Sequence, residues 1–86
     1  MPNHESARKR LRQSEKKRLS NRSVRSEIRT RTRNLFAMDS CSEAEAALRE
    51  LYAILDRAAR RRIVHPNAAA RHKARVARYV RSLQEA

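Results

Sequence analysis

The sequence predicts an all-α protein: a three-helix bundle with a long N-terminal helix projecting beyond the bundle. Apolar residues recur at three- and four-residue spacing in three segments, which is the pattern of helices that bury one face. Two short stretches between these segments, DSCSE at 39–43 and IVHPN at 63–67, carry turn-forming and helix-starting residues. No repeat or low-complexity linker interrupts the 86 residues, so we expect a single domain over 1–86 with one modest core.

The first helix is predicted over 5–37. Its N-terminal part, 6–22, contains no proline, glycine or β-branched residue, so nothing there opposes a helix. At 100° per residue, Val24, Ile28 and Leu35 fall on one stripe. Extended toward the N-terminus, this stripe meets only polar or basic residues: Asn21, Lys17, Ser14 and Arg10. We therefore expect the C-terminal half to pack on the other helices and the N-terminal half to project, fraying when nothing binds it.

The second helix is predicted over 43–61. Ser42 with Glu45 matches a capping box, in which the two side chains satisfy amides of the first turn. Ser40 with Glu43 is the competing register. An apolar stripe predicts one buried face, formed by Ala44, Leu48, Leu51, Leu55 and Ala58.

The third helix is predicted over 66–83. Pro66 suits a first helical position, where no amide hydrogen is needed, and Asn67 as the capping residue is the alternative. The apolar stripe of this helix consists of Ala69, Val76, Val80 and Leu83. The opposite arc carries Arg71, Arg75, Arg78 and Arg81. One face is therefore expected in the core and the other in solvent or against a ligand.

The charge of the chain is large and unevenly distributed. The 22 lysines and arginines against 9 acidic residues give a net charge of +13. Residues 1–38 carry twelve basic and three acidic side chains, residues 39–56 one and five, and residues 57–86 nine and one. This distribution, with two cationic ends and an acidic middle, predicts a polyanionic partner. The acidic middle is expected to face away from that partner.

The composition excludes several kinds of function. Without glycine there is no phosphate-binding loop or dinucleotide fingerprint, and no apolar run is long enough to span a bilayer. Aromatic residues make up only 3%, which argues against a reader of single strands that stacks bases on aromatic rings. The single Cys41 fits a reducing, cytosolic setting. Cys41 and the histidines lack the spacing of a metal site or a nucleophilic pair, so we expect no metal, no cofactor, no catalytic residue, no small-molecule substrate and no enzymatic activity.

The residue types favour RNA among the polyanions. Arginine outnumbers lysine, and its planar guanidinium binds phosphate through two hydrogen bonds and stacks on exposed bases. Short polar side chains suited to phosphate and ribose accompany the charges: Ser14, Ser20, Asn21, Ser23 and Asn67. Basic residues surround the N-terminal half of the first helix, so no apolar face remains to enter a membrane. This pattern fits a helix placed among several phosphate backbones of a folded RNA.

Three stretches resemble the bacterial small-subunit ribosomal protein S20 family: SARKRLRQSEKKRLSNR at 6–22, RSEIRT at 25–30 and IVHPNAAARHKAR at 63–75. The resemblance covers nearly the whole chain. It implies a three-helix bundle that binds 16S ribosomal RNA directly, supports subunit assembly and sits as a monomer among other small-subunit components of the cytoplasmic ribosome. The family commonly has a glycine where this chain has Arg62, and an arginine there would bear strain if the backbone is left-handed.

The expected RNA contacts come from two arguments. The resemblance implies contacts by Ser6, Lys9, Arg10, Ser14, Arg18, Asn21, His65, Asn67, Arg71 and Lys73. The position and charge of further residues add Arg8, Arg12, Lys16, Lys17, Arg22, Arg25, Arg29, Arg75 and Arg78.

Two other classes of protein share some of these features. A basic-region DNA-binding protein would also show a cationic helix, but it needs a dimerising zipper, and the apolar stripe of the first helix is followed by a break. A histone-like protein would be equally basic and would bind duplex DNA without regard to sequence. Comparing the affinities for ribosomal RNA and duplex DNA separates these alternatives.

Overall fold

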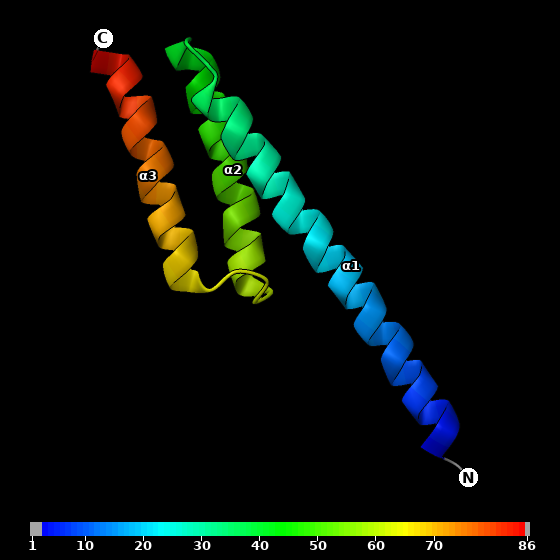
Figure 1. Cartoon of the computed structure of the whole chain (residues 1–86). Coiled ribbons are helices and arrows are strands. Elements are labelled where there is room, and N and C mark those ends of the chain that lie inside the picture. Colours follow the sequence, from blue (N-terminus) through cyan, green and yellow to red (C-terminus); the bar gives the residue numbers. More distant parts are fainter. Residues whose placement is uncertain (1–2, 86) are drawn as a thin grey trace.

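The structure is a computed structural model that describes residues 3–85 of the chain. These residues form three helices and no strand: α1 (Asn3–Phe36), α2 (Cys41–Arg60) and α3 (Pro66–Glu85). Helices α2 and α3 lie antiparallel, and the C-terminal half of α1 packs beside α2 (Figure 1). The N-terminal half of α1 runs on past the turn between α2 and α3, so the molecule measures 68 × 21 × 13 Å. The predicted all-α bundle with a projecting first helix is confirmed.

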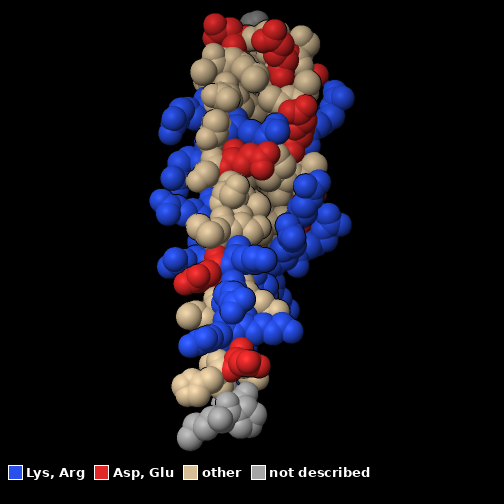
Figure 2. All heavy atoms as spheres, turned by 90° about the vertical axis from the view of Figure 1, so that its right-hand side faces the viewer, with Lys and Arg blue, Asp and Glu red and all other residues tan. Residues whose placement is uncertain are grey.

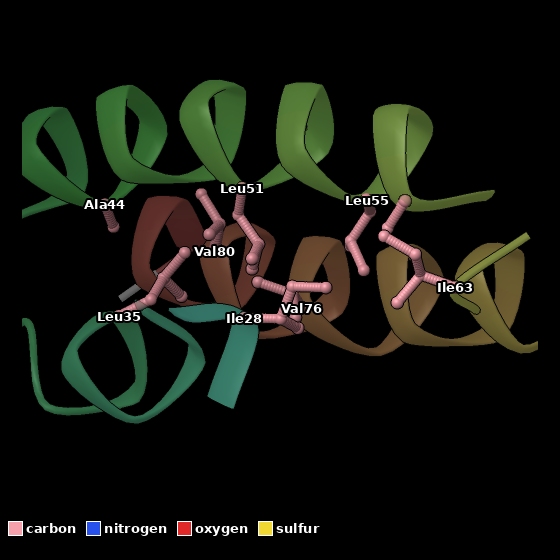
Figure 3. Close-up of a cluster of buried hydrophobic side chains, with 9 residues drawn as sticks. Ile28, Leu35, Ala44, Leu51, Leu55, Ile63, Val76 and Val80 are labelled. Carbon is pink, nitrogen blue, oxygen red and sulfur yellow. The ribbon is translucent and has the colours of Figure 1, made fainter. Parts of the chain in front are cut away.

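One apolar core lies where the three helices meet (Figure 3). Helix α1 contributes Ile28 and Leu35, and α3 contributes Val76 and Val80. The remaining buried members come from α2 and the turn that follows it: Ala44, Leu51, Leu55, Ala58 and Ile63. Leu35, Leu51 and Val76 have no exposed surface, so each of the three helices places one large side chain at the centre. Burial of such side chains stabilises the bundle by roughly 1.5–3 kcal/mol each.

Helix α1 consists of two halves with different surroundings. Every residue from 4 to 20 is exposed, and Val24 is the first apolar side chain that packs on the core. Ile28 is the first buried one. We call residues 4–23 the arm. The apolar stripe ends where the sequence analysis expects it to end, because only the C-terminal half of α1 has a neighbouring helix to bury against.

Helix α2 starts two residues earlier than the sequence predicts. Its first residue is Cys41, and Ser40, with an extended backbone at ψ 123°, occupies the capping position. The predicted capping box of Ser42 and Glu45 is therefore wrong, because both residues lie inside the helix. The Ser40 side chain does not cap the helix either, since its oxygen lies 3.2 Å from that of Ser42. The competing prediction, with Ser40 as the capping residue, gives the observed start of α2. The Ser40 side chain, however, makes no hydrogen bond to an amide of the first turn.

Helix α2 ends in a left-handed turn at Arg62. The backbone φ of Arg62 is 58°, whereas that of the preceding Arg61 is −84°. The amide of Ile63 donates to the carbonyl of Ala58 at 2.9 Å, and the amide of Arg62 donates to that of Ala59 at 3.1 Å. This pair of bonds is the Schellman motif, and the buried Ile63 supplies the apolar contact that accompanies it. Arginine thus occupies a conformation that glycine adopts without cost.

Helix α3 begins at Pro66, as one of the two predicted alternatives has it. The capping group is the imidazole of His65, whose Nδ1 accepts a hydrogen bond from the amide of Asn67 at 3.1 Å. The carbonyl of His65 accepts the amide of Ala69 at 3.0 Å. His65 therefore satisfies first-turn groups, and Asn67 is inside the helix instead of capping it.

Candidate nucleic-acid interface

The arm presents charge in every direction around its axis. Its residues follow one another at 100°, and those from 4 to 20 are all exposed. Nine of the expected RNA contacts are exposed on it: Ser6, Arg8, Lys9, Arg10, Arg12, Ser14, Lys16, Lys17 and Arg18. Asn21 is half-buried and Arg22 is exposed. The exposed Leu11 and Leu19 are isolated from each other and from the core, so the arm has no apolar face of its own.

Five arginines form a continuous stripe along one side of α1. Their spacing of three or four residues keeps them within a narrow arc of the helix, at Arg18, Arg22, Arg25, Arg29 and Arg33. The first two belong to the arm. The last three lie beside α3, where α1 has joined the bundle. The stripe therefore continues from the free half of the helix onto the packed half.

Between α1 and α3 the surface forms a groove of about 360 Å³. We call it the arginine groove. Arginine side chains line it from both helices, together with less polar groups: Arg25, Arg29, Arg33 and Arg75, with Ile28, Thr32, Phe36 and His72. None of these eight lining residues is acidic. The groove is thus an open, positively charged depression between α1 and α3.

Several groups in the arginine groove are fixed by contacts within the protein. Arg25 donates a hydrogen bond from its guanidinium to the carbonyl of Ile63 at 3.0 Å, across the turn that ends α2. The guanidinium of Arg75 lies 5.7 Å from the centre of the Phe36 ring. That ring packs edge-on against Tyr79 at 4.9 Å. Two of the four guanidinium groups are therefore positioned before any ligand binds.

The base of the groove holds a polar pair. The buried hydroxyl of Thr32 donates to the carbonyl of Ile28 at 2.7 Å, so it accepts from His72 Nε2, which lies 2.9 Å away. Partial burial lowers the pKa of His72 below its usual 6.5, and the nearby charge of Arg75 lowers this pKa further. The imidazole is therefore neutral at pH 7 and adds a hydrogen-bonding group without adding to the repulsion among the arginines.

A second basic surface surrounds the turn between α2 and α3. Arg60, Arg62 and His65 line a depression of about 590 Å³ there, and Asn67 is exposed on the first turn of α3. Arg71, Arg75 and Arg78 are exposed on α3. Because Arg25 bonds to Ile63, this turn lies beside the point where the arm leaves the bundle. The expected RNA contacts of the second motif therefore lie close to those of the first.

Lys73 is placed differently from the other expected contacts. It points toward α2, where its ammonium pairs with Asp56 and lies 5.1 Å from the centre of the Tyr52 ring. The helical spacing puts Lys73 on the opposite side of α3 from Arg71 and Arg75. The structure thus gives Lys73 a contact between two helices and separates it from the arginine face.

The two tyrosines lie at the rim of the core and connect segments of the bundle through hydrogen bonds. The hydroxyl of Tyr79 donates to the carbonyl of Met38 at 2.8 Å, and that of Tyr52 donates to the carbonyl of Lys73 at 3.3 Å. Both side chains are half-buried. Neither ring is a free platform for a base.

More acidic residues lie on the bundle than on the arm, which carries Glu5 and Glu15. Viewed toward α1, lysine and arginine are most frequent over the lower part of the molecule and its flanks, while more of the aspartate and glutamate lies in the upper half, with smaller acidic groups among the lower basic ones (Figure 2). That upper end is where α2 begins and α3 finishes (Figure 1). Asp39 and Glu43 therefore lie at the end of the bundle away from the arm, whereas Asp56 lies near the turn that ends α2.

Sequence reasoning missed two parts of this surface. Arg33 extends the spacing of Arg22, Arg25 and Arg29, so the helical period alone could have added it to the expected contacts. The depression beside Arg62 depends on the left-handed turn, whose only signal was an arginine at a position that favours glycine.

Metal binding and thiol chemistry concern other residues of the described part of the chain. Residues 3–85 contain no group of three side chains suited to hold a metal ion. Cys41 bonds to Glu45 at 3.7 Å, and partial burial together with this carboxylate raises the pKa of its thiol. A thiol in this state is a poor nucleophile. No helix within the same residues is long and apolar enough to cross a membrane.

Comparison with known proteins agrees with the sequence resemblance. A model of the family described as "Ribosomal protein S20" matches residues 2–81. Relatives named "Small ribosomal subunit protein bS20" include that of Salinibacter ruber, 42% identical over 98% of this chain and 100% of its own. Those of Coxiella burnetii and Pseudomonas paraeruginosa are 45% and 40% identical over 96% and 100% of this chain, and 96% and 98% of their own. The chain belongs to the ribosomal protein S20 family, whose members are structural proteins of the small ribosomal subunit and not enzymes.

Proposed function

We propose that this protein binds 16S ribosomal RNA directly, as a structural component of the small subunit of the cytoplasmic ribosome, and supports the assembly of that subunit. The observation that carries this proposal is the arm. A helical segment rich in basic residues, and exposed from residue 4 to residue 20, needs a partner that surrounds it with negative charge. Folded RNA offers several phosphate backbones to one helix, whereas a flat membrane touches one side only.

The arrangement of the bundle supports the same partner. The arm, the arginine groove and the turn at Arg62 are all basic and lie at adjoining places, so one RNA surface can contact all three. The end of the bundle with Asp39 and Glu43 points away and remains for solvent or for other small-subunit components. One copy of the chain supplies all of these surfaces, which agrees with a monomer in the assembled particle.

A DNA-binding role is the alternative from a different class. A basic-region protein needs a second copy held by a zipper, yet the apolar stripe of α1 is already buried against α2 and α3. A histone-like protein binds duplex without preference for folded RNA. Preference for one nucleic acid therefore decides between the two functions.

The test is a competition binding experiment at matched salt. Labelled 16S ribosomal RNA is bound to the full chain and displaced with either unlabelled RNA or duplex DNA of equal phosphate content. We expect the RNA to compete at least about 100-fold better, in line with specific against non-specific nucleic-acid binding. Equal competition by both would overturn the proposal in favour of a histone-like role.

A matched pair of variants connects the binding to the arm. Lys17→Glu changes an exposed charge on the arm, and Arg49→Glu changes an exposed charge on α2 by the same amount. The first is expected to weaken RNA binding by about tenfold, since it removes one phosphate contact and adds repulsion. The second is expected to have a smaller effect. If the two variants lose equal affinity, the arm is not the principal contact.

A further inference from the structure

The arginine groove differs from the arm in being built before any ligand arrives. Residues 4–20 of the arm are exposed on a helix that no other helix covers there. In the groove, Arg25 is bonded to the Ile63 carbonyl and Arg75 rests over Phe36, so two guanidinium groups have defined positions. A site whose side chains are already ordered loses less entropy on binding than one whose side chains are free.

The charges in the groove have no partner within the described residues that line it. Four arginines face one volume of about 360 Å³, and none of the other lining residues is an acid. The nearest acid of α1, Glu27, is paired at 3.1 Å with Arg31, which also reaches Glu50 of α2 at 2.9 Å. Those bonds hold Glu27 on the side of α1 that faces α2. An anion in the groove would therefore relieve repulsion among like charges.

The shape of the groove indicates an extended anion. It runs between two helices, and the arginines on its walls are exposed. On the α1 side they continue the stripe that begins on the arm with Arg18 and Arg22. Successive members of the stripe are three or four residues apart, so they recur about every 4.5–6 Å along the axis. A row of cations at this spacing suits a chain of phosphates better than a single small anion.

We propose that the arginine groove seats a run of consecutive phosphates of one RNA strand, gripped by Arg29 and Arg33 of α1 and by Arg75 of α3. This inference rests on the proposed function and names a second, preformed contact besides the arm. The strand continues from the groove along the stripe to Arg22 and Arg18. Thr32 and His72 line the groove between the arginines, and their hydrogen bond to each other is retained when the strand binds.

The experiment uses phosphate ethylation interference on 16S ribosomal RNA. Ethylation removes the charge of single phosphates at random, and RNA that still binds the full-length protein is separated from RNA that does not. Phosphates essential for binding are then mapped for the wild type and for the double variant Arg29→Gln, Arg75→Gln. Arg25 is left unchanged because it also holds the carbonyl of Ile63.

A matched double variant, Arg49→Gln with Arg57→Gln, serves as the control. Both of its positions are exposed on α2 and neither lines the groove, so the loss of net charge is the same. The groove variant is expected to lose at least about tenfold in affinity beyond the control, since each guanidinium–phosphate pair is a charge-assisted bond. A short run of neighbouring phosphates should also stop interfering with the groove variant alone.

The outcomes separate this inference from the proposed function. If the wild type shows no preference for ribosomal RNA, the proposed function fails. If the wild type binds but the groove variant keeps the full interference pattern of the control, the groove holds no phosphates and the inference is overturned. Thermal unfolding of both variants shows whether they remain folded. A third variant, Arg29→Gln with Arg33→Gln, keeps the contact between Arg75 and Phe36. Ethylation of an overlapping run of phosphates must also stop interfering with the binding of this variant.

Discussion

At the scale of single residues, Arg62 combines a left-handed backbone with a side chain that disfavours it. The turn is kept because two backbone bonds and the burial of Ile63 stabilise it. Arg62→Gly is therefore expected to raise the free energy of unfolding by about 1 kcal/mol, or the melting temperature by about 4–8 °C. Arg61→Gly removes the same charge at a φ of −84° and should give no such gain. Equal shifts in thermal unfolding for both variants would contradict the strain at Arg62.

A second single residue, His72, is expected to make the stability of the protein depend on pH. Burial, assisted by Arg75, lowers the pKa of His72 below 6.5 in the folded protein, so the unfolded chain binds a proton first as the pH falls. Stability from this group is therefore full above about pH 7 and is lost progressively from pH 6.5 down to the folded pKa. His72→Gln is expected to flatten the stability curve in that window, measured by chemical denaturation at each pH. An NMR titration of His72 with a midpoint above 6.5 would show that the sign is wrong.

At the scale of elements, the two halves of α1 should respond oppositely to the same kind of substitution. Ile28→Asp places a carboxylate without a partner in the core and is expected to cost about 3–5 kcal/mol, enough to unfold much of the protein. Lys17→Asp alters an exposed arm residue and should change the free energy of unfolding by less than about 0.5 kcal/mol. Circular dichroism during thermal unfolding measures both. Destabilisation by Lys17→Asp comparable to that by Ile28→Asp would mean that the arm packs within the chain.

The elements also show what sequence alone could predict. The spacing of Val24, Ile28 and Leu35 defines where α1 joins the bundle, because a helical period acts locally. The sequence predicts the start of α2 two residues too late because two serines, each followed by a glutamate three residues later, give equivalent capping signals. The resemblance places Lys73 among the RNA contacts, and the structure adds a pairing of its ammonium with Asp56 of α2 that the local pattern does not show. The arginine groove needs the crossing of α1 and α3, which no local pattern encodes.

At the scale of the whole molecule, the basic arm, groove and turn give a broad electrostatic contact. If about ten phosphates are neutralised, the logarithm of affinity should fall with the logarithm of salt concentration at a slope of about −7 to −9. Filter binding to 16S ribosomal RNA between about 50 and 200 mM salt measures this slope. A slope shallower than about −3 would mean that few phosphates are contacted. The contact would then depend on shape or on bases instead of on charge.

The exposed arm is also expected to make the free protein sensitive to proteolysis. Proteases cut segments that open locally at little free-energy cost, and a helix without tertiary contacts opens in this way. Residues 4–23 carry eight lysines and arginines, each a cleavage point for trypsin-like enzymes. Nucleic acid wrapped around the arm would shield all of them at once. Surplus copies would then be degraded first, and the amount of intact protein would follow the amount of RNA available to hold it.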